Sequence, residues 1–277
     1  MPLFQRLGEL GILGLSIGEE YGGAGLDAAS IVIAHEELSY SDPAFCLSYL
    51  AHSILFGNNL HVNGSEEQKL KWLPSVCDGT TICGMCMSEP NAGTDVLGMS
   101  TTAKYDSGLD SYILNGTKMW ITNGVVEGGV NGQQQQTGDI FLIYAKTGPT
   151  RQEVTQFIVE RGTPGFSLGQ KITDKCGMRA SMTAELVFQD VVLPKPTHVV
   201  GHVHGALLCM MRNLEIERIA LAAMSLGIAK RCIDEMVQYS SERKAFGKEL
   251  HQFGQIQNFL ATSYAEYMAG KYHEEEE

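Results

Sequence analysis

The sequence has 277 residues, 44% of them hydrophobic, which is enough for one large domain or two small ones with a buried core. Acidic residues outnumber basic ones by 32 to 20, which argues against a general nucleic-acid binder because phosphate contacts need a cationic surface. No stretch is long and apolar enough to predict a transmembrane helix, and residues 1–15 do not have the pattern of a signal peptide.

Residues 1–82 predict a helical domain. Apolar residues recur at helical spacing in residues 28–38, and the glycine-rich loop of residues 20–25 separates them from an earlier helix. Ser65 and Gln68 have the spacing of a capping box, which begins a helix that Pro74 is expected to stop. The predicted helices are residues 4–15, 28–38 and 66–72.

Residues 83–200 predict a β-barrel-like domain built from short strands. Asn115-Gly116 lies between two strand-like runs, residues 111–114 and 118–122, and this dipeptide is the strongest short-range signal for a β-hairpin. A polar loop containing Gln133 to Gln136 follows, and we interpret it as an exposed insertion. The further predicted strands are residues 139–145, 155–160 and 184–188.

Residues 201–277 return to a helical pattern. Residues 207–231 are periodic, residues 233–243 continue the pattern, and Phe246-Gly247 breaks it before a helix of residues 255–268. Helices therefore occupy both ends of the chain with strands between them, which predicts an α+β fold.

The cysteines give no sign of a disulfide framework or a metal site. Their number is odd and they are spread along the chain, which fits reduced thiols. Cys83 and Cys86 have C-x-x-C spacing, but a zinc site needs a second pair of ligands that the sequence does not offer. The seven cysteines are Cys46, Cys77, Cys83, Cys86, Cys176, Cys209 and Cys232.

Two segments carry side chains that could meet on one ligand. Residues 86–95 form a turn in which backbone N–H groups and the hydroxyls of Ser88 and Thr94 can converge. Strand alternation places Trp120 and Thr122 on one side, so that a flat ring could stack on the indole and bond the hydroxyl. An ordinary capped loop and a core tryptophan beside a turn remain the alternatives.

Five segments, in order along nearly the whole chain, resemble the acyl-CoA dehydrogenase family. Residues 85–98 resemble the family's signature, and Trp120-Ile121-Thr122 resembles its flavin-contact strand. The other segments are residues 19–25, 175–179 with 184–194, and 243–247. The resemblance implies an enzyme that uses FAD to oxidise an acyl-CoA thioester to a trans-2-enoyl-CoA.

The resemblance also implies roles for individual residues. Thr94 would touch the CoA side as well as the flavin, and Arg243 would reach the FAD of a partner subunit. Gln255 lies one position later than the glutamine that the family has after this arginine. The residues implied in cofactor binding are Met85, Met87, Ser88, Thr94, Trp120, Ile121, Thr122, Arg243 and Gln255.

The catalytic base is assigned to Glu217 by the same resemblance. Residues 214–218 read Leu-Glu-Ile-Glu-Arg and fit the Leu-x-Glu-Arg form in which isovaleryl- and long-chain-type members carry their base. The neighbours implied at the substrate site are Glu215, Ile216 and Arg218, with Thr94 from the loop.

Helical spacing independently predicts a buried orientation for Glu217. Glu215 lies about 200° around the helix from it and is expected to point elsewhere. An apolar setting would raise the pKa of the Glu217 carboxyl, which suits a base that removes a carbon-bound proton. An exposed Glu217 paired with Arg212 or Arg218 remains the alternative. The residues that share its helical face are Leu221, Met224 and Ile228.

Substrate, partners and location are implied only by the resemblance. A short branched acyl group, electron-transfer flavoprotein, a homotetramer, and the mitochondrial matrix or a bacterial cytoplasm are the expectations. The chain would begin inside the family's first helical block and end before the rest of its helical bundle. A catalytically silent fragment and an acyl-CoA oxidase on the same scaffold are the competing interpretations.

Overall fold

The computed structural model describes residues 2–126 and 136–276. The α-helices are α1 (Pro2–Glu9), α2 (Ala28–Ser41), α3 (Pro43–Leu50), α4 (Asn59–Asn63), α5 (Glu66–Cys77), α6 (Lys195–His198), α7 (Ala206–Glu242) and α8 (Gly254–Glu276). A π-helical segment, η2 (Ala51–Asn58), joins α3 to α4, and single 3-10 turns occur at η1 (Glu19–Tyr21), η3 (Val96–Gly98) and η4 (Leu250–Gln252). The strands are β1 (Cys83–Cys86), β2 (Thr102–Asp106), β3 (Ser111–Thr122), β4 (Ile140–Lys146), β5 (Val154–Glu160), β6 (Phe166–Ile172), β7 (Thr183–Pro194), β8 (Val199–Val200), β9 (Lys244–Ala245) and β10 (Lys248–Glu249).

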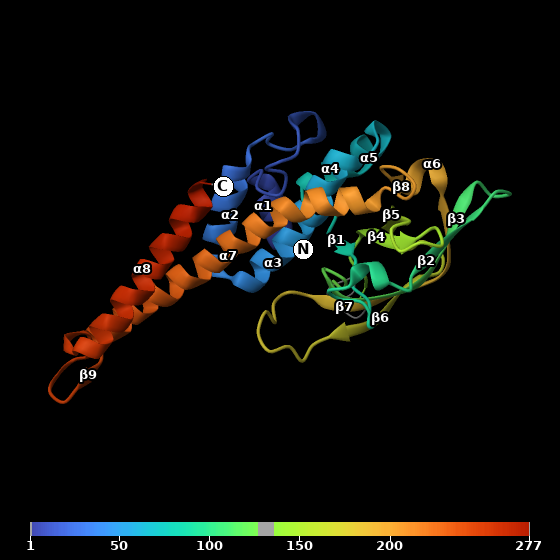
Figure 1. Cartoon of the computed structure of the whole chain (residues 1–277). Coiled ribbons are helices and arrows are strands. Elements are labelled where there is room, and N and C mark those ends of the chain that lie inside the picture. Colours follow the sequence, from blue (N-terminus) through green and yellow to red (C-terminus); the bar gives the residue numbers. More distant parts are fainter. Residues whose placement is uncertain (1, 127–135, 277) are drawn as a thin grey trace.

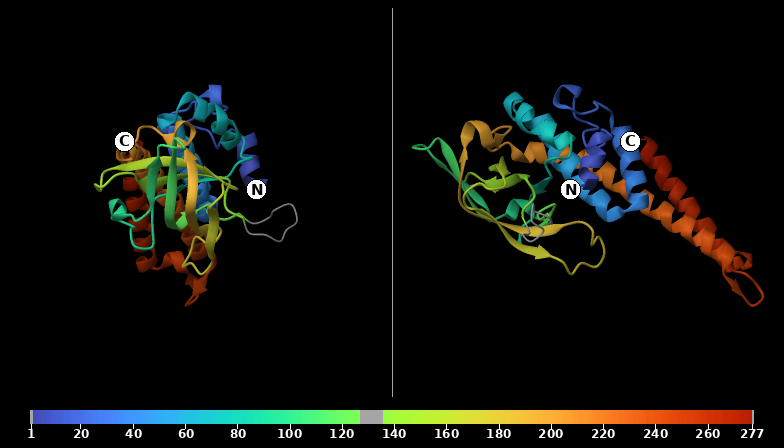
Figure 2. Two further views of the ribbon diagram at one scale, coloured as in Figure 1. Left: turned by 90° about the vertical axis from the view of Figure 1, so that its right-hand side faces the viewer. Right: turned by 180° about the vertical axis from the view of Figure 1, so that it is seen from behind.

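The molecule is elongated, with the sheet at one end and helices extending from it (Figure 1). Helix α7 has 37 residues and runs from beside the sheet, past the N-terminal helices, to the opposite tip of the molecule. The small hairpin of β9 and β10 forms that tip, and α8 returns antiparallel to α7, as Figure 2 shows from behind. The α+β fold is therefore confirmed, while the exact domain limits at residues 82 and 200 stay a prediction.

The predicted middle β domain is confirmed as a large sheet, but its described strands do not close into a barrel. Its described strands follow the order β6-β7-β3-β2-β4-β5-β8, and β1 pairs with β4 beside this path. Strands β6 and β8 end the path without pairing with each other among the described residues. Two parallel pairings, β1 with β4 and β2 with β4, interrupt an otherwise antiparallel arrangement.

Strand β4 places its side chains in two separate cores because alternate residues point to opposite faces. Phe141 and Ile143 lie in a core formed between strands. Ile140 and Leu142 pack instead with residues of the N-terminal helices, among them Phe56. The sheet is thus buried on both faces at this strand, which explains its continuous apolar run.

The predicted hairpin at Asn115-Gly116 is wrong, because β3 runs straight through this dipeptide from Ser111 to Thr122. A bulge between Leu114 and Gly116 absorbs the dipeptide instead of a turn. Gly116 has a φ of 151°, and a Cβ there would lie 2.7 Å from the Cα of Thr101. The glycine therefore permits a close approach of two chain segments.

The helix starts were predicted better than the helix ends. The capping box of Ser65 and Gln68 is confirmed, with the Gln68 amide donating to Ser65 Oγ at 3.2 Å. Helix α5 nevertheless continues through Pro74, because burial of Leu73 and Val76 outweighs the loss of one backbone hydrogen bond. Helix α1 stops early, since Gly11 adopts a φ of 73°.

The helices predicted for residues 201–277 are present in the structure. The two predicted runs, residues 207–231 and 233–243, form one continuous helix. Residues 207–231 and 233–243 belong to α7, except that Arg243 is its C-cap. Phe246 and Gly247 both have positive φ, 51° and 78°, and form the turn of the terminal hairpin. The predicted insertion at Gln133 to Gln136 lies outside the described residues, except for Gln136, which bridges to Val126.

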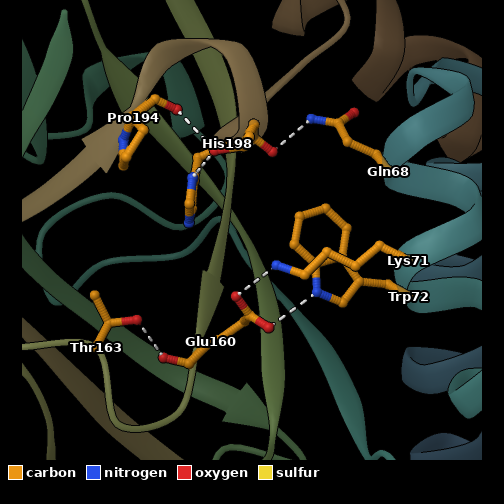
Figure 3. A network of polar contacts seen from close by, with 8 residues as sticks. Gln68, Lys71, Trp72, Glu160, Thr163, Pro194 and His198 are labelled. Atoms are coloured by element: carbon orange, nitrogen blue, oxygen red, sulfur yellow. Dashed lines mark hydrogen bonds and ion pairs between the residues drawn. The ribbon is translucent and has the colours of Figure 1, made fainter.

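A polar clamp joins α5 to the sheet (Figure 3). Trp72 Nε1 donates to Glu160 Oε1 at 3.0 Å, and Lys71 Nζ donates to the other carboxylate oxygen at 3.2 Å. The Gln68 side chain donates to the Val199 carbonyl at 2.8 Å. These contacts fix the N-terminal helices against the end of β5 and the approach to α7.

Close packing of α2 on α7 depends on Gly227. A Cβ at this position would lie 2.1 Å from Ser39 Oγ and 2.2 Å from the Glu36 carbonyl oxygen. Because the carbonyl cannot retreat unless the helices separate, we expect Gly227→Ala to lower the free energy of unfolding by about 2 kcal/mol in urea denaturation. Gly254→Ala is the control, since none of the described atoms lies within 4 Å of its Cβ. An equal loss in both variants would contradict this account.

Candidate active site

The carboxylate of Glu89 joins the beginning of the loop after β1 to the end of that loop. The amide of Ser100 donates to Glu89 Oε2 at 2.6 Å, and the amide of Thr101 donates to Oε1 at 3.1 Å. The Glu89 backbone also exchanges two hydrogen bonds with Ala92, of 2.9 and 3.1 Å. The turn that carries Ser88 and Thr94 is therefore tied down at both ends by one residue.

Lys118 of β3 neutralises this carboxylate inside the protein. Its Nζ lies 2.9 Å from Glu89 Oε1, and the two side chains are 0% and 4% exposed. Burial alone would raise the pKa of Glu89, but the Lys118 ammonium and the loop hydrogen bonds lower it on balance. The pair is thus a buried ion pair, with Lys118 also donating to the Met87 carbonyl at 3.0 Å.

Strand β3 departs from regular geometry where the predicted flavin-contact residues lie. Its pairing with β7 shifts between Lys118 and Ile121, and Trp120 takes a φ of 62°. This left-handed conformation costs an aromatic residue about 1–3 kcal/mol, so the surrounding structure must hold it. Asn123 also has a positive φ, 61°, and donates to the carbonyls of Ser48 and Cys83 at 2.9 Å each.

Exposure alternates through this irregular segment, while the prediction that Trp120 and Thr122 face the same side stays a prediction. Trp120 is 54% exposed, Ile121 is buried in the sheet core, and Thr122 is half-buried. The indole and the threonine hydroxyl are therefore available on a surface, whereas the Ile121 side chain is not. Any contact of Ile121 with a ligand would have to come from its backbone.

The start of α7 packs against the same loop. An apolar cluster joins Met85 and Met87 to Met210 and Leu214 of the helix, with Met99 from the end of the loop. Leu214 lies three residues before Glu217 on α7, so the helix that carries the predicted base packs on the predicted flavin-binding loop. The arrangement brings together segments that are more than a hundred residues apart in the sequence.

Glu217 is half-buried, and its Oε2 atom is buried without a hydrogen-bond partner among the described residues. Burial raises the pKa of Glu217, and the nearby charge of Arg218 opposes this increase. A buried carboxylate oxygen without a hydrogen-bond partner from the protein is costly, and such groups occur where a ligand completes the site. The alternative of an exposed carboxylate is therefore not what the structure shows.

The helical face assigned to Glu217 needs a correction. Leu221 is 37% exposed, whereas Ala220, Ala223 and Met224 are buried. Glu217 thus lies at the border of the buried face of α7, because the buried stripe follows small residues that let α2 approach. Glu215 is exposed, as its angular position predicted.

Several polar side chains lie close to the buried carboxylate. Asn213, one turn before Glu217, is 4% exposed and its Nδ2 has no partner within the described structure. Its Oδ1 accepts a hydrogen bond from Asn58 Nδ2 at 3.5 Å. Tyr144 accepts from Asn59 Nδ2 at 3.2 Å, and burial, with a smaller contribution from Glu217, raises the pKa of its hydroxyl.

Some of the predicted site residues lie far from the others in the structure of this chain. Arg243 and Gln255 are exposed and flank the β9–β10 hairpin, at the far tip from the sheet (Figure 1). Ile216 packs in a different cluster, against Ile31 and Ile54 of the N-terminal segment. Thr94 and Arg218 are exposed. Their assigned roles stay predictions.

Sequence reasoning missed the residues that hold the site together. Glu89, Lys118 and Asn123 all lie within the motifs but have no assigned role there, because their partners are distant in sequence. A lysine at an inward position of a strand was the available signal for Lys118. Asn123 stands before Gly124, a pair that favours left-handed backbone. Nothing in the sequence pattern marked Asn213.

The described residues give no support to metal chemistry. No group of three or more His, Cys, Asp or Glu side chains in residues 2–126 and 136–276 could hold a metal ion. Cys83 and Cys86 are free thiols within β1, and burial raises the pKa of both. None of the helices in these ranges is long and apolar enough to cross a membrane.

Comparisons with known proteins agree along the whole chain. Residues 1–80, 84–191 and 205–275 match the family models described as acyl-CoA dehydrogenase N-terminal, middle and C-terminal domain. Mitochondrial isovaleryl-CoA dehydrogenase of Pongo abelii is 40% identical over 270 residues, covering 96% of this chain and 60% of that protein.

Two solved structures show the same fold. Butyryl-CoA dehydrogenase from Megasphaera elsdenii has a TM-score of 0.90 and 36% identity, covering 99% of this chain and 70% of that one. Acyl-CoA dehydrogenase from Bacillus anthracis, solved in complex with FAD, has a TM-score of 0.88 and 32% identity, covering 97% of this chain and 44% of that one.

The extent of these matches decides what they show. The chain spans about 60% of the length of the curated relatives it matches, so the activity of a complete relative does not transfer directly. Family membership does transfer, because three consecutive family models match and a solved relative above 30% identity is covered over 70% of its length. The chain belongs to the acyl-CoA dehydrogenase family.

Proposed function

We propose that this chain carries the catalytic centre of an FAD-dependent acyl-CoA dehydrogenase, with Glu217 as the base. The observation that carries the proposal is the buried Oε2 of Glu217, which has no partner among the described residues and lies on the helix that packs through Leu214 on the loop after β1. A buried carboxylate with a raised pKa can accept a proton from the carbon α to a thioester carbonyl.

The residues of the loop after β1 and of the end of β3 fit a flavin. Trp120 offers an exposed indole held at a strained φ, and Thr122 and Ser88 offer half-buried hydroxyls on the same strand and on the adjoining loop. An aromatic plane beside hydrogen-bonding groups suits a flat, polar-edged ring. FAD, when bound, would supply the acceptor for the β hydrogen as a hydride. Arg243 and Gln255, at the opposite tip, would serve the FAD of a neighbouring subunit.

Several of the predicted site residues have a defined task in this proposal. Glu217 would remove the α proton, and its apolar surroundings would keep water from competing for that proton. Met85, Met87 and Leu214 would form the apolar wall between loop and helix. Thr94, Glu215 and Arg218 are exposed and free to meet the CoA part of the substrate.

The finer assignments follow the relatives. We propose a short branched acyl group, as the name of the Pongo abelii relative indicates, with electron-transfer flavoprotein as the electron acceptor and a tetramer as the assembly. One observation favours the alternative of a silent fragment. A groove of about 560 Å³ between α7 and α8 is lined by apolar residues such as Leu226 and Met236, and a complete helical bundle would cover it.

A visible spectrum tests the proposal. The purified chain, supplied with FAD, is expected to show a protein-bound flavin spectrum that bleaches anaerobically when isovaleryl-CoA is added. Bleaching by isovaleryl-CoA should be faster than by butyryl- or palmitoyl-CoA. A chain that stays colourless with added FAD would favour the silent fragment, and rapid reoxidation by oxygen would favour an acyl-CoA oxidase.

A further inference from the structure

We propose that Glu89 and Lys118 act together as a positioning pair, which holds the Met87–Ser88 backbone and Trp120 in the arrangement that a flavin ring requires. The ligand in this statement rests on the proposed function. The mechanical part does not, because it concerns contacts that the protein makes by itself.

The first support is how completely the pair is enclosed. Lys118 Nζ contacts Glu89 Oε1 at 2.9 Å, the Met87 carbonyl at 3.0 Å and Met99 Sδ at 3.9 Å. Neither side chain is more than 4% exposed. Buried ion pairs with apolar surroundings often add no net stability relative to apolar residues, so a need for defined geometry accounts for such a pair better than stability does.

The second support is that both partners are bonded to the loop itself. Glu89 accepts hydrogen bonds from the amides of Ser100 and Thr101 at the far end of the loop, while Lys118 donates to the Met87 carbonyl at its near end. One ion pair therefore fixes the two ends of the loop against each other. Loss of either charge releases both ends.

The third support is the strained backbone next to Lys118. Trp120 lies two residues along the strand with a φ of 62°, and the intervening Met119 amide donates to the Ser88 carbonyl at 3.0 Å. A strained residue persists only where its neighbours over-determine it. Lys118 on one side and Asn123 on the other are the side chains that fix this segment in the structure.

Hydrogen exchange of the protein without FAD tests the mechanical part. The double variant Glu89→Gln/Lys118→Met is expected to speed amide exchange in residues 87–101 and 118–122 by about tenfold. The double variant keeps the fold, since it leaves no unpaired buried charge. Glu36→Gln is the matched control, because Glu36 is 6% exposed and accepts from Tyr267 and Lys271 at 3.1 and 2.8 Å, away from this loop. Unchanged exchange in the double variant, or faster exchange throughout the sheet, would overturn the proposal.

Flavin affinity gives the second measurement. The double variant should bind FAD about 100-fold more weakly than the original chain, although its melting temperature stays close. Glu36→Gln should lower the melting temperature without weakening FAD binding. Equal FAD affinity in the double variant would refute the positioning role. If the original chain itself binds no FAD, the proposed function fails, and the exchange rates alone still decide whether the pair positions the loop.

Discussion

Replacing Glu217 by Gln is expected to slow bleaching of the bound flavin by about 10³-fold while leaving flavin binding intact. The amide has nearly the shape of the carboxyl, so the apolar wall of Met210 and Leu214 should stay in place. It cannot accept the α proton, and this step is the one assigned to the carboxylate. Anaerobic stopped-flow absorbance with isovaleryl-CoA measures the rate directly.

Glu215→Gln is the matched control for this prediction. Glu215 lies on the same helix two residues earlier, carries the same charge and is exposed. The flavin bound to Glu215→Gln should bleach at close to the rate of the unsubstituted protein, although the affinity of this variant for acyl-CoA can change. The assignment of the base would be wrong if Glu217→Gln kept its rate or if Glu215→Gln lost it.

The pH dependence of bleaching follows from the same carboxyl. Only the ionised form of Glu217 accepts a proton, and burial raises its pKa. The rate should therefore rise with pH, and its midpoint should lie above about 4.3, the ordinary value for glutamic acid. Because Arg218 opposes the shift, Arg218→Gln should move the midpoint to still higher pH. A midpoint at or below the ordinary value would contradict the buried base.

Local patterns were enough to predict the helical parts of the fold. The capping box at Ser65 and the turn at Phe246-Gly247 are determined by residues within a few positions, so they could be read correctly. Pro74 and Asn115-Gly116 were misread because their surroundings decide the outcome. Pro74 stays helical since α5 buries Leu73 and Val76, and Gly116 permits a close approach of Thr101, which directly precedes β2.

The candidate site divides in the same way. Helical spacing was sufficient to predict that Glu217 is more buried than Glu215, while its role as the base, taken from motif order, stays a prediction. These patterns could not show that Arg243 lies at the opposite tip, which depends on the length of α7. Nor could they pair Glu89 with Lys118, since 29 positions separate them and the packing of the loop on β3 brings them together.

Removal of the Lys118 charge is expected to be the most destabilising single substitution proposed for this chain. Lys118→Met leaves the Glu89 carboxylate buried without its cation, and breaking a buried pair in this way costs about 3–5 kcal/mol. Urea denaturation at neutral pH measures the loss. Lys71→Met is the control, because its pair with Glu160 is 50% and 38% exposed and should contribute less than about 1 kcal/mol.

Acid should reveal the same pair through the pKa of Glu89. This pKa is lower in the folded protein than in the unfolded chain, so the ionised carboxylate stabilises the fold at any pH above about 4.3. That stabilisation is lost as the pH falls through the folded pKa. In Glu89→Gln/Lys118→Met this part of the acid sensitivity should disappear, because position 89 no longer carries a carboxyl. The free energy of unfolding of this variant at neutral pH should recover most of what Lys118→Met loses, because no charge remains buried. If the double variant were as unstable as Lys118→Met, the loss would come from packing around the lysine stem and not from the unpaired carboxylate.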